Sequence, residues 1–204
     1  MSILRSKLFQ ITLFTGCLLA LTGGVMLYMH QHQEQPKKIV HVRAPVPVTT
    51  GIVDFNYQRD HDYVNAVFED DENWYWLVDG SRSDFSPEDM MKTMSASRDL
   101  STKGDLIMKM LYVEGKPAGF SAYYNKNFYL GKIRFIYVDP AFRGAGYGLQ
   151  LVNAAVDDLK ARGANKIALV TRSSNLPAQR IYEKAGFTLQ KSPEGFAEFT
   201  KVIG

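Results

Sequence analysis

The chain has 204 residues, of which 46% are hydrophobic and 22% charged, and a formal net charge of +3 at pH 7, so its length allows one domain with a full core plus appendages. Five Lys and Arg residues oppose one acid before Thr50, and 19 oppose 20 acids from Thr50 onward; this near-neutral part argues against nucleic-acid binding through phosphate neutralisation. The single cysteine, Cys17, excludes an intrachain disulfide and lies in an apolar stretch, so we expect no cysteine nucleophile.

The first predicted element is an apolar run at residues 8–28 (LFQITLFTGCLLALTGGVMLY). At a rise of about 1.5 Å per residue, such a run spans a hydrocarbon core of about 30 Å. It is longer than the apolar region of a secretory signal and continues well past Cys17, which favours an uncleaved anchor over signal or lipoprotein processing. We therefore divide the chain into a short flank (1–7), a single transmembrane anchor (8–29), a linker (30–49) and one folded domain (50–204).

The charges that flank the anchor nearly balance, because Arg5 and Lys7 precede it and three Lys and Arg residues follow it. They lean slightly towards a C-terminal domain on the cytoplasmic side, and an exported domain stays open as the alternative. The linker contains three histidines with no cluster of cysteines or carboxylates nearby, and we interpret them as solvated residues, so no metal site is expected.

After Thr50, strand and helix patterns alternate without an internal repeat. We expect a strand at 51–58, a helix at 59–70 and a helix at 86–97 capped by Ser86. Three strands at 106–113, 118–124 and 128–138, joined by Gly-Lys-Pro and Asn-Lys-Asn turns, predict an antiparallel meander. A helix at 149–162, a strand at 166–171, a helix at 177–185 and strands at 188–191 and 196–202 complete an α+β fold with a mixed sheet. The helix at 149–162 carries its apolar face at Val152, Ala155, Val156 and Leu159.

A glycine-rich loop at 138–148 (VDPAFRGAGYG) precedes the helix at 149–162, whose first acid is Asp157. A helix N-terminus without carboxylates, behind glycines that let backbone N–H groups approach closely, favours an anion. A tight turn that needs glycine only for its dihedral angles would give the same pattern. Leu149 follows Gly148 where a Walker loop requires lysine, and it stands where a dinucleotide fingerprint requires a small residue, so both patterns are excluded.

The loop resembles the Arg/Gln-x-x-Gly-x-Gly/Ala motif of the GCN5-related N-acetyltransferase (GNAT) family, here Arg143, Gly146 and Gly148. The segment 173–187 (SSNLPAQRIYEKAGF) is similar to the family's later signature, with matching Asn175, Ala178, Tyr182, Gly186 and Phe187. The resemblance covers about residues 50–204. It implies a GNAT-like acyl-CoA N-acyltransferase fold, acetyl-CoA as co-substrate, and a small-molecule or peptide amine as acceptor.

The same resemblance implies roles for individual residues. Backbone groups that hold the pyrophosphate would come from Arg143, Gly144, Ala145, Gly146, Tyr147 and Gly148. Backbone groups that bind pantetheine and the acetyl carbonyl would come from Ile136, Tyr137 and Val138, or these are plain core residues. Asn175 would hydrogen-bond the cofactor or a water, or else cap a helix. Tyr182 would protonate the coenzyme A thiolate, since a phenol has a pKa near 10, or else pack its helix onto the sheet.

The general base is where this sequence departs from the family's pattern. Members that acetylate ribosomal proteins or N-termini carry a glutamate five residues before the asparagine, and here that residue is Val170. A water, a tyrosine such as Tyr123 or Tyr124, or no base at all stay open, and a protein N-terminal acceptor is in doubt. The acidic and aromatic run 69–76 (EDDENWYW) lies where relatives form part of the acceptor cleft, although it also fits a solvated helix end.

Two functions compete on these grounds. The first is a membrane-tethered N-acetyltransferase that acts by direct transfer on the primary amine of an unidentified acceptor. Because acetyl-CoA is cytosolic, this function places the domain on the cytoplasmic side of the membrane. The second is a catalytically weak or inactive acyl-CoA-binding regulatory module, which the missing carboxylate motivates.

Overall fold

The computed structural model describes residues 49–97, 99–191 and 194–203. The expected flank, the anchor at 8–29 and all but the last residue of the linker lie outside these ranges. Within them, no helix is both long and apolar enough to cross a membrane.

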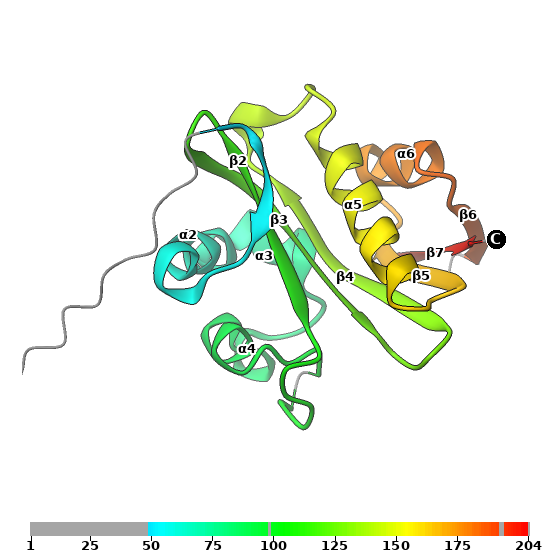
Figure 1. The fold of residues 1–204 in the computed structure, drawn as a ribbon, viewed down its shortest axis with the longest axis horizontal. Coiled ribbons are helices and arrows are strands. Elements are labelled where there is room, and N and C mark those ends of the chain that lie inside the picture. The colour runs from blue at the N-terminus through cyan, green and yellow to red at the C-terminus, as the bar shows by residue number, and fades with distance from the viewer. Residues whose placement is uncertain (1–48, 98, 192–193, 204) are drawn as a thin grey trace, which may run out of the picture. The chain divides into compact units, whose positions relative to one another are not determined.

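The described residues form one seven-stranded sheet in the order β1-β2-β3-β4-β5-β7-β6 (Figure 1). The strands are β1 (Gly51–Asp54), β2 (Ile107–Val113), β3 (Lys116–Asn125), β4 (Leu130–Val138), β5 (Lys166–Arg172), β6 (Thr188–Lys191) and β7 (Phe196–Val202). Each neighbouring pair in this sheet is antiparallel except β4 and β5, which run parallel. The predicted mixed sheet and its β2-β3-β4 meander are therefore confirmed. The insertion of β7 between β5 and β6 was not part of the prediction.

Helices cover both faces of this sheet (Figure 1). One face carries α2 (Tyr57–Glu69), α3 (Asp71–Leu77) and α4 (Pro87–Thr93); the other carries α5 (Tyr147–Ala161) and α6 (Leu176–Lys184). Ser86 caps α4 as expected, because its side chain accepts a hydrogen bond from the Asp89 N–H at 3.1 Å. The apolar face predicted for α5 is confirmed, since its four residues are all buried.

α3 is the helix that the sequence patterns did not separate from α2. Asp70 is extended, with φ −69° and ψ 128°, so it ends α2, and its side chain accepts a hydrogen bond from the Asn73 N–H at 2.8 Å. One aspartate therefore stops one helix and caps the next. The four acids of the run at 69–76 are exposed at the end of α2 and in the first turn of α3, as the interpretation of a solvated helix end expects. The rest of the run belongs to α3, with Trp74 buried.

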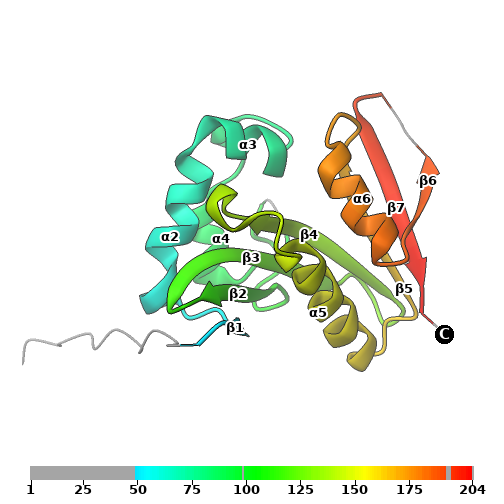
Figure 2. The ribbon, with the colours of Figure 1, turned by 90° about the horizontal axis from the view of Figure 1, so that it is seen from above.

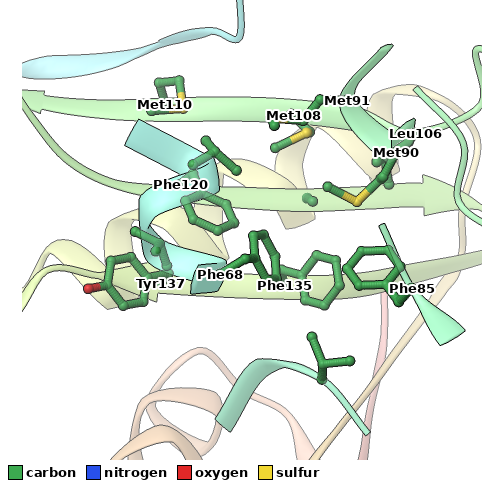
Figure 3. Close-up of a cluster of buried hydrophobic side chains, with 14 of the residues drawn as sticks. Phe68, Phe85, Met90, Met91, Leu106, Met108, Met110, Phe120, Phe135 and Tyr137 are labelled. Atoms are coloured by element: carbon green, nitrogen blue, oxygen red, sulfur yellow. The ribbon is translucent and has the colours of Figure 1, made fainter. Parts of the chain in front are cut away.

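The face under α2, α3 and α4 holds a core of aromatic and methionine side chains (Figure 3). Phe68 of α2 lies at its centre, with its ring centroid 5.3 Å from that of Phe135 and 5.8 Å from those of Phe85 and Phe120. These separations are typical of aromatic pairs that add packing energy beyond their buried area. This core fixes α2 against β3 and β4, and thereby sets one wall of the site described next.

Candidate functional site

β4 and β5 separate at their carboxyl ends. Their pairing includes only Leu130 with Lys166, Gly131 with Ile167 and Lys132 with Ala168. In Figure 2, β6 and β7, which follow β5 in the sheet, lie on the other side of α5 from β2 and β3. Because the strands run parallel, both carboxyl ends lie at this opening, where neither strand satisfies the other's backbone groups.

A bulge in β4 marks the start of this separation. Ala122 pairs with Phe135 and Tyr123 with Ile133, so Arg134 is an extra residue in β4. The insertion reverses the alternation of side chains. Ile133 consequently packs under α5, whereas Phe135 and Tyr137 pack under α2 and α3.

Backbone groups of β4 beyond the bulge face the opening. The Asp139 N–H donates to the Ala118 carbonyl at 2.9 Å, and Val138 lies opposite Gly119. Because hydrogen-bonded and non-bonded pairs alternate in an antiparallel ladder, the backbone groups of Ile136 and Val138 point away from β3. Those of Tyr137 point towards β3. Of the three expected residues, two can therefore offer backbone groups to a bound molecule.

The loop that follows β4 leads into an uncapped helix. Gly144 and Gly146 have φ values of 87° and 84°, in the left-handed region that favours glycine. Gly146 is the N-cap of α5, no side chain caps this end, and no acid lies in its first turn. The first N–H groups of α5 therefore lack helical partners, and the helix dipole adds positive potential there. This end of α5 is suited to a phosphate group.

Other loop residues hold this helix end in place. Arg143 is exposed, and its Nε donates to the Val138 carbonyl at 2.9 Å, which ties the loop back to β4. Gly148 is buried, and a Cβ added there would lie 3.0 Å from Ile181 Cδ1 of α6. Ala145 is exposed and Tyr147 is half-buried. Gly148 therefore serves the close approach of α5 and α6, whereas Gly144 and Gly146 serve the backbone conformation.

Tyr182 projects from α6 into the core beneath α5. Its ring centroid lies 6.3 Å from that of Phe187 and 5.8 Å from that of Phe199. Burial raises the pKa of Tyr182 to about 12, and no described residue hydrogen-bonds to its hydroxyl. A phenol with this pKa keeps its proton at neutral pH, so it can act as an acid and not as a base. The ring packs the helix, and the hydroxyl is left available.

Asn175 is the N-cap of α6. Its Oδ1 accepts a hydrogen bond from the Ala178 N–H at 3.3 Å, so the helix-cap interpretation is confirmed. Its Nδ2 has no partner among the described residues. One end of the amide therefore holds the helix while the other can donate to a bound molecule.

α3 spans the opening from the side opposite α5. Asn73 Nδ2 donates to the Tyr137 hydroxyl at 3.4 Å, which links α3 to β4. Arg172 of β5 stacks over the Tyr75 ring at 4.0 Å and donates to the Tyr75 carbonyl. α3 is thus fastened to both separating strands. This geometry places the 69–76 run beside the opening.

A pocket of about 270 Å³ lies where the two strands begin to separate. Tyr124, Lys132, Arg134 and Val170 contribute to its lining. Burial raises the pKa of the Tyr124 hydroxyl, an effect that nearby Arg134 reduces. Tyr123, the other expected tyrosine, is fully buried under α5 and does not line the pocket, because adjacent strand residues point to opposite faces.

Three residues of this region were not among the expected site residues. Lys132 lies two residues before Arg134, the bulged residue, and polar residues at such spacing indicate an accessible face of a strand. Tyr63 of α2 has a buried hydroxyl without a partner among the described residues, and its pKa is raised by burial and by the nearby Tyr137 and Asp139. No pattern in the sequence predicts that Tyr63 lies near Tyr137 and Asp139, because this proximity depends on how α2 packs against β4.

Comparison with known proteins agrees with this geometry. The profile of the acetyltransferase (GNAT) family matches residues 54–187. The chain is 40% identical over 68 residues to the [ribosomal protein bS18]-alanine N-acetyltransferase of Haemophilus ducreyi. This match covers 30% of this chain and 47% of that protein. The chain is also 42% identical over 59 residues to the mycothiol acetyltransferase of Streptosporangium roseum. This match covers 29% of this chain and 18% of that protein. The matches therefore span less than half the length of these curated relatives.

Solved structures share the fold at low sequence identity. The PaiA N-acetyltransferase of Thermoplasma acidophilum, in complex with coenzyme A, has a TM-score of 0.61 at 16% identity, covering 76% of this chain and 99% of that one. The ribosomal-protein-S18-alanine N-acetyltransferase of Escherichia coli has a TM-score of 0.57 at 18% identity, covering 76% of this chain and 95% of that one. They share the fold, and the profile match over residues 54–187 shows that this chain belongs to the acetyltransferase (GNAT) family.

Proposed function

We propose that this protein transfers the acetyl group of acetyl-CoA directly to the primary amine of an acceptor. The observation that carries the proposal is the uncapped N-terminus of α5 beside the opening between β4 and β5. Coenzyme A has a pyrophosphate for the helix end and an extended amide-containing arm for an unpaired strand edge. Bound acetyl-CoA supplies an activated thioester to this opening.

The residues of the chain divide the remaining work. N–H groups of the 143–148 loop and the first turn of α5 hold the pyrophosphate, with Gly144 and Gly146 providing the backbone conformation. Backbone groups of Ile136 and Val138 orient the arm along β4, and the Asn175 amide donates from the opposite side of the opening. These contacts place the reacting groups, which is itself a large part of catalysis.

Tyr182 provides the proton for the departing thiolate. Its hydroxyl is protonated at neutral pH and has no described partner that competes for the proton. The burial that raises the pKa of Tyr182 also raises the basicity of a thiolate brought beside it, which keeps the two groups matched. No carboxylate is among the described residues that line the pocket at Val170, so no described side chain is assigned as the base for the acceptor amine.

A test of this proposal measures thiol release from acetyl-CoA by the full chain across small amines, amino acids, polyamines, antibiotics and peptides. We expect release that depends on both acetyl-CoA and an amine, and Gly146→Trp to abolish it by filling the phosphate site. A valine at position 170, where relatives carry a glutamate, favours a second candidate function: an acyl-CoA-binding module without turnover. Tight binding of acetyl-CoA with no amine-dependent release would replace the enzyme proposal with that module.

The apolar run at residues 8–28 supports a further part of the proposal: a single membrane anchor with the domain on the cytoplasmic side, where acetyl-CoA is available. Reporter fusions at residue 50 test the orientation. We expect activity from a reporter that works in the cytoplasm. Activity only from a reporter that requires export would reverse the assignment.

A further inference from the structure

The pocket at the start of the strand separation opens on the face of the sheet opposite α5 and α6. Tyr124 packs against the core under α2–α4, and Arg134 stacks over Phe85 and Phe135 of that core at 4.9 and 5.0 Å. The phosphate loop and Tyr182 belong to the other face. A molecule in the pocket would therefore meet bound acetyl-CoA from the opposite side of the opening.

The pocket has a cationic lining. Arg134 donates to the Ala96 carbonyl and to the Ser95 carbonyl, which fixes its guanidinium at the pocket wall. Lys132 lines the same pocket, is only half-buried, and makes no hydrogen bond or ion pair with another described residue. No Asp or Glu is among the described residues that line it. A lysine ammonium beside a fixed guanidinium is a site that an anion would stabilise.

Two acids and a phenol lie around this cationic lining. Glu198 of β7 pairs in register with Val170, and its carboxylate forms an ion pair with Lys191 at 3.1 Å. Asp105 acts on the pKa of Tyr124, but its carboxylate accepts a hydrogen bond from the Ala96 N–H at 2.9 Å and is directed to that loop. Tyr124 has a raised pKa because it is buried, so its hydroxyl stays protonated at neutral pH and can donate to an anion. Lys132, Arg134 and Tyr124 thus bring three hydrogen-bond donors to the lining of one pocket.

We propose that this pocket binds a carboxylate carried by the acceptor, so that the preferred acceptors are small amines of the amino-acid type. The inference rests on the proposed acetyl transfer and names the acceptor class for it. Polyamines and aminoglycosides are disfavoured, because their additional positive charges would meet Lys132 and Arg134. A volume of about 270 Å³ also suits a small anionic end better than a multi-ring antibiotic.

The test compares matched acceptors that differ only in the carboxylate: glycine with methylamine, alanine with ethylamine, and phenylalanine with phenethylamine, with spermidine added as a polycation. With the full chain, we expect kcat/KM to be at least about tenfold higher for each carboxylated amine. In Lys132→Met, which keeps the apolar stem, this preference should fall to about twofold or less through a higher KM. Because the readout is the ratio within each matched pair, a general effect of Lys132→Met on the rate cancels.

Two controls separate the charge from a structural effect. Lys132→Arg should retain most of the preference, since it retains the charge. Lys126→Met, at an exposed lysine in the β3–β4 turn, should leave the preference unchanged. Equal use of both members of each pair, preference for spermidine, or an unaltered preference in a folded Lys132→Met would overturn the inference while leaving acetyl transfer intact.

A second measurement applies where no amine supports thiol release, an outcome that counts against the proposed function itself. Calorimetric titration of N-acetylglycine and of N-methylacetamide into the protein with coenzyme A then tests the pocket directly. Binding of N-acetylglycine that weakens at least about tenfold in Lys132→Met, with no such change in Lys126→Met, supports the carboxylate site. Equal affinity in both variants, or no binding of N-acetylglycine, rejects it.

Discussion

Arg172 fastens α3 to the end of β5 by stacking over the ring of Tyr75, with 4.0 Å between its guanidinium carbon and the ring centroid. Its Nε also donates to the Tyr75 carbonyl at 2.5 Å. On the other side of the opening, Asn73 contacts the Tyr137 hydroxyl of β4. α3 therefore behaves as a bridge between two strands that no longer hydrogen-bond to each other.

Loss of this bridge should affect the acceptor side of the site more than the acetyl-CoA side. We expect Arg172→Ala to raise the acceptor KM several-fold and to lower the free energy of unfolding by about 1–2 kcal/mol, because a stacked guanidinium and its hydrogen bond are removed. Acetyl-CoA affinity should change little. Steady-state kinetics and urea unfolding measure these effects. Arg180→Ala, at an exposed arginine of α6, is the matched control, and equal kinetic effects of the two changes would contradict the bridge.

Tyr182→Phe separates the two roles of this residue, since phenylalanine retains the ring packing and loses only the hydroxyl. We expect kcat to fall about 100-fold while acetyl-CoA affinity and the unfolding midpoint stay close to wild type. Because the pKa of Tyr182 is about 12, the wild-type profile of kcat should show no alkaline decline from this group up to about pH 10. Tyr129→Phe, in the exposed β3–β4 turn, serves as control. Retention of full kcat in Tyr182→Phe would leave packing as its only role.

Gly148→Ala tests whether this glycine serves helix packing. The added methyl group would lie 3.0 Å from Ile181 Cδ1, so the Ile181 side chain, or α6 with it, must shift by a few tenths of an ångström. We expect a loss of about 1–3 kcal/mol in unfolding free energy and weaker acetyl-CoA binding, as the helix end shifts. Ile181→Val removes the offending atom, and the double variant should recover part of both losses. If Ile181→Val gives no recovery, the glycine acts through the phosphate contact instead.

The lowered pKa of Glu88 in α4 predicts that the stability of the fold decreases in acid over a defined pH range. Hydrogen bonds from Tyr57, Asn65 and Lys92 lower the pKa of Glu88 from 4.5 to about 2. A carboxyl whose folded-state pKa is depressed stabilises the fold above its ordinary pKa, and this contribution is lost as the pH falls from about 4.5 towards 2. We expect Glu88→Gln to lower the urea midpoint at pH 7, and the difference from wild type to shrink across that window. Glu183→Gln, at an exposed position of α6, should show no such pH-dependent difference.

Local chemistry made much of this protein predictable from its sequence. Glycines at 144 and 146 permit the left-handed backbone that the loop adopts. The lack of acids in the first turn of α5 can be read directly from the sequence, and the buried face of α5 follows from apolar residues that recur with a period of 3.6. Each depends on residues within a few positions of one another. The meander, the strand-helix alternation and the anion-receptive helix end were therefore predictable, and so was the cap formed by Ser86.

Tertiary structure alone decided which side chains share the opening. The bulge at Arg134 reverses the faces of β4, and the short pairing of β4 with β5 creates the pocket; both arise from register between strands far apart in the chain. Tyr123 and Tyr124 were equal candidates in the sequence, yet one is buried under α5 and the other lines the pocket. The juxtaposition of Lys132, Arg134 and Val170 likewise depends on these long-range pairings, which no local pattern encodes.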